Sequence, residues 1–468
     1  MSVQTSFQSP AAIALNRFGL GGRPTDAVTG DPKRWIIEQF SKFDERPALF
    51  ASLDDAGEAV KNYREEQKAN RRMAVGGATD TKADLKANRQ DFRQNIQVLY
   101  RAGVQARADS ALATDAPFVE RMVHFWSNHF CVSADNAMVS AFAGAFERDA
   151  IRPHVLGTFF DMALAAEQHP AMLIYLNQYQ SIGPDSIAAA RNPDRKRGLN
   201  ENLGREIMEL HTLGVRSGYA QADVTEFARA LTGWTVDGLG GDRGGTGNPD
   251  RFVFRPAQHE PGTRIILGKR YDQNGEAQAR AALVDFAHSP ATATHIATKL
   301  ARHFAGDAPP PAMIARLAAS FTSSSGDLPT LYHTLINSPE AWISTPTKFK
   351  SPWEWTISAL RGIGHTRVAE MQIATLQTQL GQKVWKPGSP AGWDDIAASW
   401  AGSDALLRRV EIAQRLAAPL GDRVDARTLA PKILPASLSA VTADQIARSE
   451  SPAGAIALML VSPDFLRR

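Results

Sequence analysis

Long stretches of this chain repeat apolar residues with the period of an α-helix, whereas runs that alternate apolar and polar residues are scarce. An amphipathic helix has to bury one face, so a chain made mostly of such stretches must pack helix against helix. We therefore expect a mainly α fold with a single large multi-helical core, a small β-hairpin and long loops. Of the 468 residues, 43% are hydrophobic, which is enough to fill a sizeable interior.

Local sequence signals place several of these helices. Pro32, followed by residues 33–40, is typical of a helix with proline in its first turn. Residues 56–74 and 82–113 are rich in strong helix formers and are separated by the two glycines at 76–77. We expect these two segments to form a polar helical hairpin whose charged residues face solvent.

Three segments break the helical pattern and are expected to be loops. They are the stretch 183–198 with a basic cluster at 191–197, the glycine-rich tract 237–250, and the Pro/Gly stretch 381–395 with two tryptophans. Glycine-rich chain of this kind cannot pack a core.

One β-hairpin is expected, because two runs with strand-like patterns lie between proline and glycine residues at 251–254 and 263–267. These boundaries divide the chain into four consecutive parts that we expect to form one compact unit. The parts are N-terminal helices with the polar hairpin (1–115), a motif-bearing helical core (116–235), the Gly-rich loop and β-hairpin (236–272), and C-terminal helices with Trp-rich loops (273–468).

Charge and cysteine content exclude several classes of protein. Lys and Arg number 52 against 49 Asp and Glu, and the net charge of +3 is too small for a nucleic-acid-binding protein. The single cysteine, Cys131, excludes an internal disulfide framework and an iron–sulfur cluster held only by this chain. We therefore expect no nucleic-acid partner.

We also expect neither a signal peptide nor a membrane-spanning segment in this sequence. The N-terminus has no signal-peptide pattern, and the longest late apolar run, 453–461, is about half of the roughly 20 residues that a spanning helix needs. We therefore expect no membrane span and, by default, a cytoplasmic protein. Export together with a signal-bearing partner is the alternative.

The densest group of polar and aromatic residues lies on an expected helix. Glu120, His124 and Asn128 are four apart and form one polar stripe, whereas His129 faces elsewhere. A carboxylate one turn from an imidazole suits either a metal-ligand pair or a histidine whose tautomer is fixed by a neighbour. The structural alternative is that both histidines are hydrogen-bonded in the core beside Trp126.

A second helix has clear ends, with Asn200 as its N-cap and Gly214 as its stop. Glu201, Arg205 and Glu209 share one face of it. Two carboxylates that flank an arginine predict either a partly buried ion-pair network or a functional site. The site alternative is favoured by the third glutamate and the histidine nearby, which add oxygen ligands and a base.

These motifs identify the chain as similar to a bacterial family called domain of unknown function 1800 (DUF1800). The matching segments include 16–21, 124–130, 200–215, 231–234, 299–304 and 387–393. The resemblance implies a helical protein of unestablished activity, often encoded beside a sulfatase-like partner of the alkaline-phosphatase superfamily that bears an export signal. The family commonly has His-Asp where this chain has His259 and Glu260.

Two further features bear on function. His259 and Glu260 precede a proline and lack the second histidine of a zincin helix, so we expect them in a hairpin turn. Trp385 and Trp393 lie in the Pro/Gly loop, where exposed aromatic faces would suit sugar rings or a protein partner.

The sequence therefore predicts an enzyme in which a polar pocket gathers imidazole and carboxylate groups, a glutamate acts as general base, and histidine and arginine steady negative charge. The predicted reaction is hydrolysis or lyase cleavage of a glycan-like or other polar polymer. The candidate catalytic residues are Glu206, Glu209, His211, Arg205 and His124. The candidate substrate-binding residues are Trp126, Asn128, Trp234, Trp385 and Trp393. The candidate ligands of an optional divalent metal ion are His129, Glu201 and His259.

A second hypothesis is non-catalytic. In it the protein is a scaffold or chaperone for the sulfatase-like partner, and its contact surface consists of the basic segment 191–197 and the Trp-rich loops. The network of Glu201, Arg205 and Glu209 would then have a structural role only.

Overall fold

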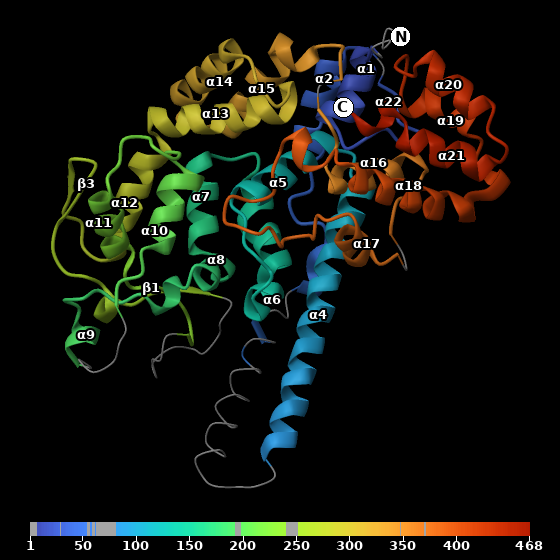
Figure 1. The fold of residues 1–468 in the computed structure, drawn as a ribbon. Coiled ribbons are helices and arrows are strands. Elements are labelled where there is room, and N and C mark those ends of the chain that lie inside the picture. Colours follow the sequence, from blue (N-terminus) through green and yellow to red (C-terminus); the bar gives the residue numbers. More distant parts are fainter. Residues whose placement is uncertain are drawn as a thin grey trace.

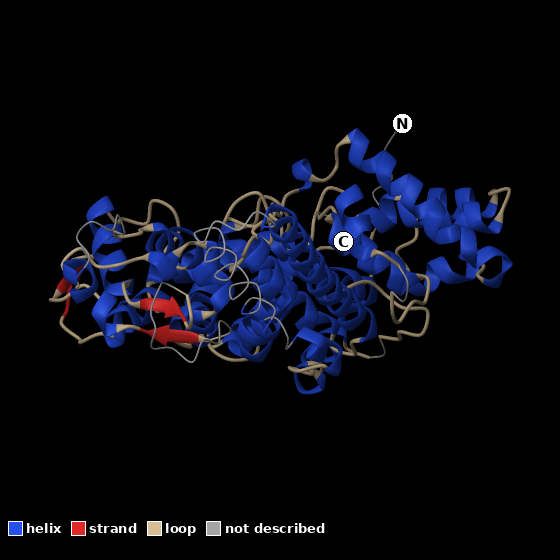
Figure 2. Cartoon of the chain, turned by 90° about the horizontal axis from the view of Figure 1, so that it is seen from below, coloured by secondary structure: helices blue, strands red, loops and turns tan. Residues whose placement is uncertain are grey.

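The computed structural model describes residues 7–28, 30–53, 57–58, 61, 81–191, 198–239, 251–346, 348–368 and 371–468. In these ranges the chain is mainly α-helical, as predicted, with two small two-stranded sheets at one end (Figure 1 and Figure 2). The α-helices are α1 (Pro10–Ile13), α2 (Pro32–Ile37), α4 (Thr81–Ala113), α5 (Pro117–His129), α6 (Ala137–Phe146), α7 (Phe159–Gln168), α8 (Pro170–Tyr175), α9 (Ile187–Arg191), α10 (Asn202–Glu206), α11 (Gln221–Leu231), α12 (Glu276–Ala287), α13 (Pro290–Ala305), α14 (Pro311–Ser323), α15 (Leu328–Asn337), α16 (Pro352–Gly362), α17 (Ile373–Gln379), α18 (Ser403–Ala417), α19 (Ala426–Ile433), α20 (Ala440–Ala447), α21 (Pro452–Val461) and α22 (Pro463–Leu466).

Many helices begin at a capping side chain followed directly by proline. The cap accepts a hydrogen bond from a first-turn N–H, and the fixed φ of proline suits a position that needs no N–H partner. Capping residues of this kind are Ser9, Asp31, Ser289, Ser351 and Ser451. The predicted helix start at Pro32 is confirmed.

One continuous hydrophobic cluster extends from Ile13 to Leu466 and includes side chains of all four predicted parts of the chain. In Figure 1, α5 and α6 lie at its centre, α18 to α21 at one end, and α7 and α10 to α12 at the other. None of the helices in the described ranges combines the length and the apolar character that crossing a membrane requires.

Helix α4 extends beyond the core as a long rod (Figure 1) and supplies the second arm of the predicted polar hairpin. The first arm, 56–74, lies outside the described residues except for 57–58 and 61. Near its C-terminal end α4 crosses α6 at two glycines. A Cβ atom added to Gly144 would lie 2.8 Å from a Leu53 methyl carbon and 3.2 Å from the Gly103 Cα. The missing side chains allow the two backbones to approach closely.

The predicted strands form, but their predicted pairing is wrong. β2 (Phe252–Phe254) pairs with β1 (Trp234–Val236), and β3 (Arg264–Ile266) pairs with β4 (Lys269–Tyr271), both antiparallel. The chain reverses directly after β3 through Leu267 and Gly268, whose φ values are 52° and 73°. Two consecutive residues with positive φ favour a tight hairpin between the strands that flank them, so β3 takes the nearer partner.

The motif helix expected between Asn200 and Gly214 forms, but its N-cap residue is Glu201 and not the predicted Asn200, its last helical residue is His211, and its pitch changes. The Asn200 side chain accepts a hydrogen bond from the Asn202 backbone N–H at 3.0 Å, and Gly214 has φ +91°. Between them, α10 continues as a π-helical turn over Ile207–His211. Such a turn inserts one residue and changes the direction of the side chains that follow it.

Gly144→Val tests the crossing of α4 and α6. The added carbons would collide with Leu53 and the Gly103 backbone, so we expect the free energy of unfolding to fall by about 1–3 kcal/mol. Urea unfolding measures the change. The control, Gly388→Val, is exposed and has no atom within 4 Å of an added Cβ, so it should leave stability nearly unchanged. Equal effects of the two variants would contradict the close crossing.

Candidate functional site

A cavity of about 250 Å³ lies between α5, α13, α16 and the loop 381–395. Its wall combines aromatic faces with charged groups. Predicted site residues that line it are His124, Asn128, Trp385 and Trp393. Other lining residues are Arg107, Arg121, Lys299, Arg302, His303, Trp353, Glu354 and Asp395.

Loop 381–395 is fastened to the C-terminal end of α5 by the Asn128 amide. Its Nδ2 donates to the Trp393 carbonyl at 2.9 Å, and its Oδ1 accepts the Trp393 N–H at 2.8 Å. Gly392, with φ +83°, passes so close that an added Cβ would lie 2.3 Å from the Asn128 carbonyl oxygen. Both ends of the amide are engaged, so Asn128 positions Trp393.

Cys131 also contacts this loop. Its Sγ donates to the Pro390 carbonyl at 3.1 Å. Burial raises the pKa of the Cys131 thiol to about 12. At neutral pH this sulfur is therefore a thiol and not a nucleophilic thiolate.

Trp385 has a left-handed backbone, with φ 51°, which is uncommon for a bulky residue. Its carbonyl accepts from the Ala134 N–H at 2.7 Å, and its indole N–H donates to Glu147 at 3.2 Å. These bonds hold its ring beside the Arg107 guanidinium, which lies 5.4 Å from the Trp385 ring centre and 4.7 Å from that of Trp353. The two rings and the guanidinium form a cation–π stack in the cavity wall.

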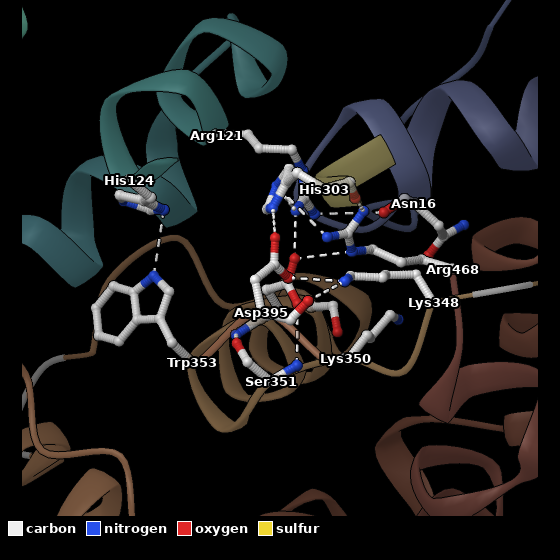
Figure 3. A network of polar contacts seen from close by, with 12 residues as sticks. Asn16, Arg121, His124, His303, Lys348, Lys350, Ser351, Trp353, Asp395 and Arg468 are labelled. Carbon is white, nitrogen blue, oxygen red and sulfur yellow. Dashed lines mark hydrogen bonds and ion pairs between the residues drawn. The ribbon is translucent and has the colours of Figure 1, made fainter. Parts of the chain in front are cut away.

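His124 is held as a neutral imidazole. The Trp353 indole N–H donates to His124 Nδ1 at 3.2 Å (Figure 3), and His124 Nε2 lies 3.7 Å from a Glu120 carboxylate oxygen. Burial, aided by the charges of Arg107 and Arg152, keeps the pKa of His124 well below its usual range. Since Nδ1 accepts, the proton resides on Nε2.

A partly buried polar network, which Figure 3 shows at close range, forms part of the cavity wall. Glu354 binds the guanidiniums of Arg121 and Arg468, the latter at 2.7 Å. His303 Nδ1 lies 2.8 Å from Asp395, and its Nε2 faces Arg121 at 3.3 Å. A guanidinium can only donate, so Nε2 accepts and Nδ1 carries the proton. Burial lowers the pKa of His303 to about 4.

The carboxylates of this network remain ionised. Burial alone would raise the pKa of Glu354, but Arg468 and Arg121 outweigh it and hold that pKa well below its usual range. The pKa of Asp395 is likewise raised by burial and lowered further by His303 and Lys348, with a net shift far downward. Neither group can serve as an acid at neutral pH.

Lys299 contacts His129 at the cavity wall. Its Nζ lies 2.9 Å from His129 Nδ1, and His129 Nε2 lies 3.0 Å from the His211 carbonyl oxygen. Because a carbonyl only accepts, Nε2 carries the proton and Nδ1 receives a hydrogen from the lysine. Burial lowers the pKa of Lys299 to about 8 and that of His129 well below its usual range.

Behind this pair, His211 Nδ1 lies 2.7 Å from Oε1 of the buried Glu167. The structure therefore brings together the predicted residues His129 and His211. Glu206, one turn before His211, is half-buried, and burial raises its pKa.

The remaining members of the second motif form a separate, partly exposed network. Arg205 lies 3.2 Å from Glu201 and 3.4 Å from Glu209. Gln221 and Thr225 complete it with hydrogen bonds to Glu201 at 2.8 Å and 2.6 Å. The arrangement is the ion-pair alternative of the sequence analysis, and none of these side chains lines the cavity.

Three other predicted residues also lie away from the cavity wall. Trp126 is fully buried and donates its indole N–H to the Tyr332 hydroxyl at 2.7 Å. Trp234 is fully buried in β1. His259 follows β2, and its Nδ1 lies 2.9 Å from the Thr232 carbonyl oxygen.

The predicted metal ligands His129, Glu201 and His259 belong to three different contact networks. Within the described ranges, no three His, Cys, Asp or Glu side chains are grouped so that they could hold a metal ion. The residues of these ranges therefore do not fit a metal centre.

Sequence reasoning missed the contribution of α13. Lys299, Arg302 and His303 are three and four residues apart, so they share one helix face, and all three line the cavity. The spacing of these three residues could have indicated a shared helix face, because they lie in a segment that resembles the family.

Glu354→Gln preserves the shape of the side chain but takes the carboxylate away from the buried Arg121 and Arg468. We expect the free energy of unfolding at neutral pH to fall by about 3–5 kcal/mol. Because the folded-state pKa is depressed, the wild-type advantage is complete above the ordinary glutamate pKa of about 4.3 and shrinks as pH falls. Chemical unfolding at a series of pH values measures both.

Glu340→Gln is the matched control, because Glu340 pairs with Arg316 at 2.9 Å on the surface. It should cost less than about 1 kcal/mol. Equal losses in the two variants, or a wild-type advantage that grows toward acid pH, would show that Glu354 does not hold the network together.

Comparison with known proteins gives one match. A family described as "Protein of unknown function (DUF1800)" matches residues 13–467, whereas no curated protein and no solved structure matches the chain significantly. The matched range includes the cavity, the π-helical turn and both sheets, and this protein therefore belongs to the DUF1800 family.

Proposed function

We propose that this protein is an enzyme that cleaves a polar, glycan-like substrate by acid–base chemistry, with the Lys299 amine as the base. The observation that carries the proposal is the 2.9 Å contact between Lys299 Nζ and His129 Nδ1 at the wall of the cavity. We assign the role of base to Lys299 and not to Glu206, the residue predicted from the sequence, because Lys299 lines the cavity and Glu206 does not.

A general base works best when its pKa lies near the working pH. A lysine with the ordinary side-chain pKa of about 10.4 is protonated at neutral pH, so its nitrogen has no free lone pair to accept a proton. Burial lowers the pKa of Lys299 to about 8, so a useful fraction of the amine is uncharged near pH 7. Among the described residues it has no carboxylate within ion-pair distance to hold it charged, and its bond to His129 fixes the direction of the amine.

The other ionisable groups of the cavity are less suited to this role. His124 Nδ1 is engaged by Trp353, and both nitrogens of His303 face Asp395 or arginine. Cys131 holds its proton far above neutral pH. Lys299 therefore has the strongest case as the proton acceptor.

The cavity wall also fits a sugar. Trp353, Trp385 and Trp393 supply aromatic surface, on which a sugar ring can pack. The buried Ser127 hydroxyl lines the same space and has no hydrogen-bond partner in the described part of the chain. The volume is below the roughly 300–1,000 Å³ of sites for drug-sized ligands, so it suits one small unit of a polymer.

The scaffold alternative has less support. Residues 192–197, most of its basic contact segment, lie outside the described residues. Of the Trp-rich surface, Trp353, Trp355, Trp385 and Trp400 are buried. A protein surface could not reach these rings without a rearrangement, whereas a small ligand inside the cavity would meet Trp353 and Trp385 in its wall.

Lys299→Met tests the base on any polysaccharide that the wild-type protein cleaves in a screen. We expect kcat/KM to fall at least about 100-fold, the lower range for loss of a general base. In the wild type, kcat/KM should rise with pH and level off above about 8, since only the neutral amine accepts a proton.

Lys432→Met is the control, because Lys432 is exposed and does not line the cavity. It should keep full activity and the same pH profile. Full activity in Lys299→Met, with a folded protein, would refute the assignment.

A further inference from the structure

We infer that the substrate carries a carboxylate that binds Arg302, and that the cleavage is a β-elimination from a uronic-acid unit. The inference rests on the proposed function for the base and adds the substrate class and the reaction. The cavity face of α13 carries positively charged side chains that have no carboxylate partner among the described residues.

Arg302 lines the cavity and is half-buried. Its Nε is buried without a hydrogen-bond acceptor, and no carboxylate within the described ranges pairs with its guanidinium. A partly desolvated guanidinium without a counter-ion favours an anion, and its planar fork matches the two oxygens of a carboxylate.

The other guanidiniums of the cavity already have carboxylate partners. Arg107 lies 3.3 Å from the buried Glu147, and Arg121 binds Glu354. Of the cations in the wall, Lys299 and Arg302 are thus the pair without a carboxylate in the described structure. The attraction for a ligand anion is therefore concentrated on Arg302, which remains charged when the Lys299 amine is neutral.

Arg302 follows Lys299 by three residues, so the two side chains are neighbours on the helix surface. A carboxylate bound to Arg302 would place its adjacent carbon next to the Lys299 amine. The guanidinium would also stabilise the negative charge that develops on the carboxylate when that carbon loses its proton.

The step balances without water. The neutral Lys299 amine takes the proton from the carbon beside the carboxylate, the released electron pair forms a carbon–carbon double bond, and the bond from the next carbon to the glycosidic oxygen breaks. That oxygen then receives the proton from the Lys299 ammonium. The products are an unsaturated uronate and a free hydroxyl end.

Hydrolysis has weaker support from the same wall. Glycoside hydrolysis by a pair of carboxyl groups needs one of them protonated. Glu354 and Asp395 are both held ionised by the cations around them.

Calorimetric titration of the full chain tests the carboxylate site. The probes are glucuronate and galacturonate, glucose and galactose as neutral counterparts, and a sulfated glucose. We expect the uronates to bind at least tenfold more tightly than the others, and Arg302→Gln to raise their Kd at least tenfold. Arg302→Lys, which keeps the charge but loses the fork, should lie between. Arg427→Gln, at an exposed position away from the cavity, should bind as the wild type does.

Three results would overturn the carboxylate site. They are no binding of either uronate, binding of the neutral or sulfated sugars as tight as that of the uronates, and an unchanged Kd in a folded Arg302→Gln protein. Tight binding of the sulfated sugar alone would place a sulfate ester on Arg302 and would likewise refute a carboxylate.

Polyuronate cleavage separates this inference from the proposed function. Elimination produces an unsaturated uronate that absorbs ultraviolet light, and both Lys299→Met and Arg302→Gln should abolish that signal. If uronate binding depends on Arg302 but cleavage survives in Lys299→Met, the base is wrong and the carboxylate site stands. If the wild type cleaves only neutral glycans and Lys299→Met loses that activity, the assignment of Lys299 as the base is supported and the carboxylate inference is refuted.

Discussion

A half-buried lysine amine, with no carboxylate of the described residues within ion-pair distance, is the constraint on which this site depends. Desolvation disfavours the charged amine, which is why the pKa of Lys299 falls to about 8. His129 can orient the amine only because its own Nε2 is committed to the His211 carbonyl. That carbonyl ends the π-helical turn Ile207–His211, so a local change of helix pitch sets the geometry of a side chain on α13.

Lys299 differs from the arginines Arg107 and Arg121 of the cavity wall in the carboxylate partners that it has. Carboxylates pair with the guanidiniums of Arg107 and Arg121, whereas Lys299 and Arg302 on α13 have no such partner in the described structure. Loop 381–395 closes the other side. Asn128 holds it at Trp393, and Trp385 in the same loop has an uncommon left-handed backbone. Unusual conformations of this kind persist when surrounding bonds determine them, and they concentrate at functional sites.

Features set by local spacing were predictable from the sequence, and features set by distant contacts were not. Helix caps and the i,i+4 ion pairs of Arg205 depend on residues within one turn, so the pattern alone indicates them. His124 and Trp393 were found because composition marked their segments. The pairing of β2 with β1 and the contact of Lys299 with His129, 170 residues away, need the packed core, for which the sequence gives no spacing rule.

Titration of Lys299 itself tests most directly whether this amine can act as the base. Competitive acylation with a trace of acetic anhydride across a range of pH, read out peptide by peptide in a mass spectrometer, reports the fraction of each lysine that is neutral. We expect a midpoint of about 8 for Lys299, and a midpoint near the ordinary lysine pKa of about 10.4 for the exposed Lys432. If both lysines titrate together near the ordinary value, Lys299 is an ordinary cation and cannot be the base.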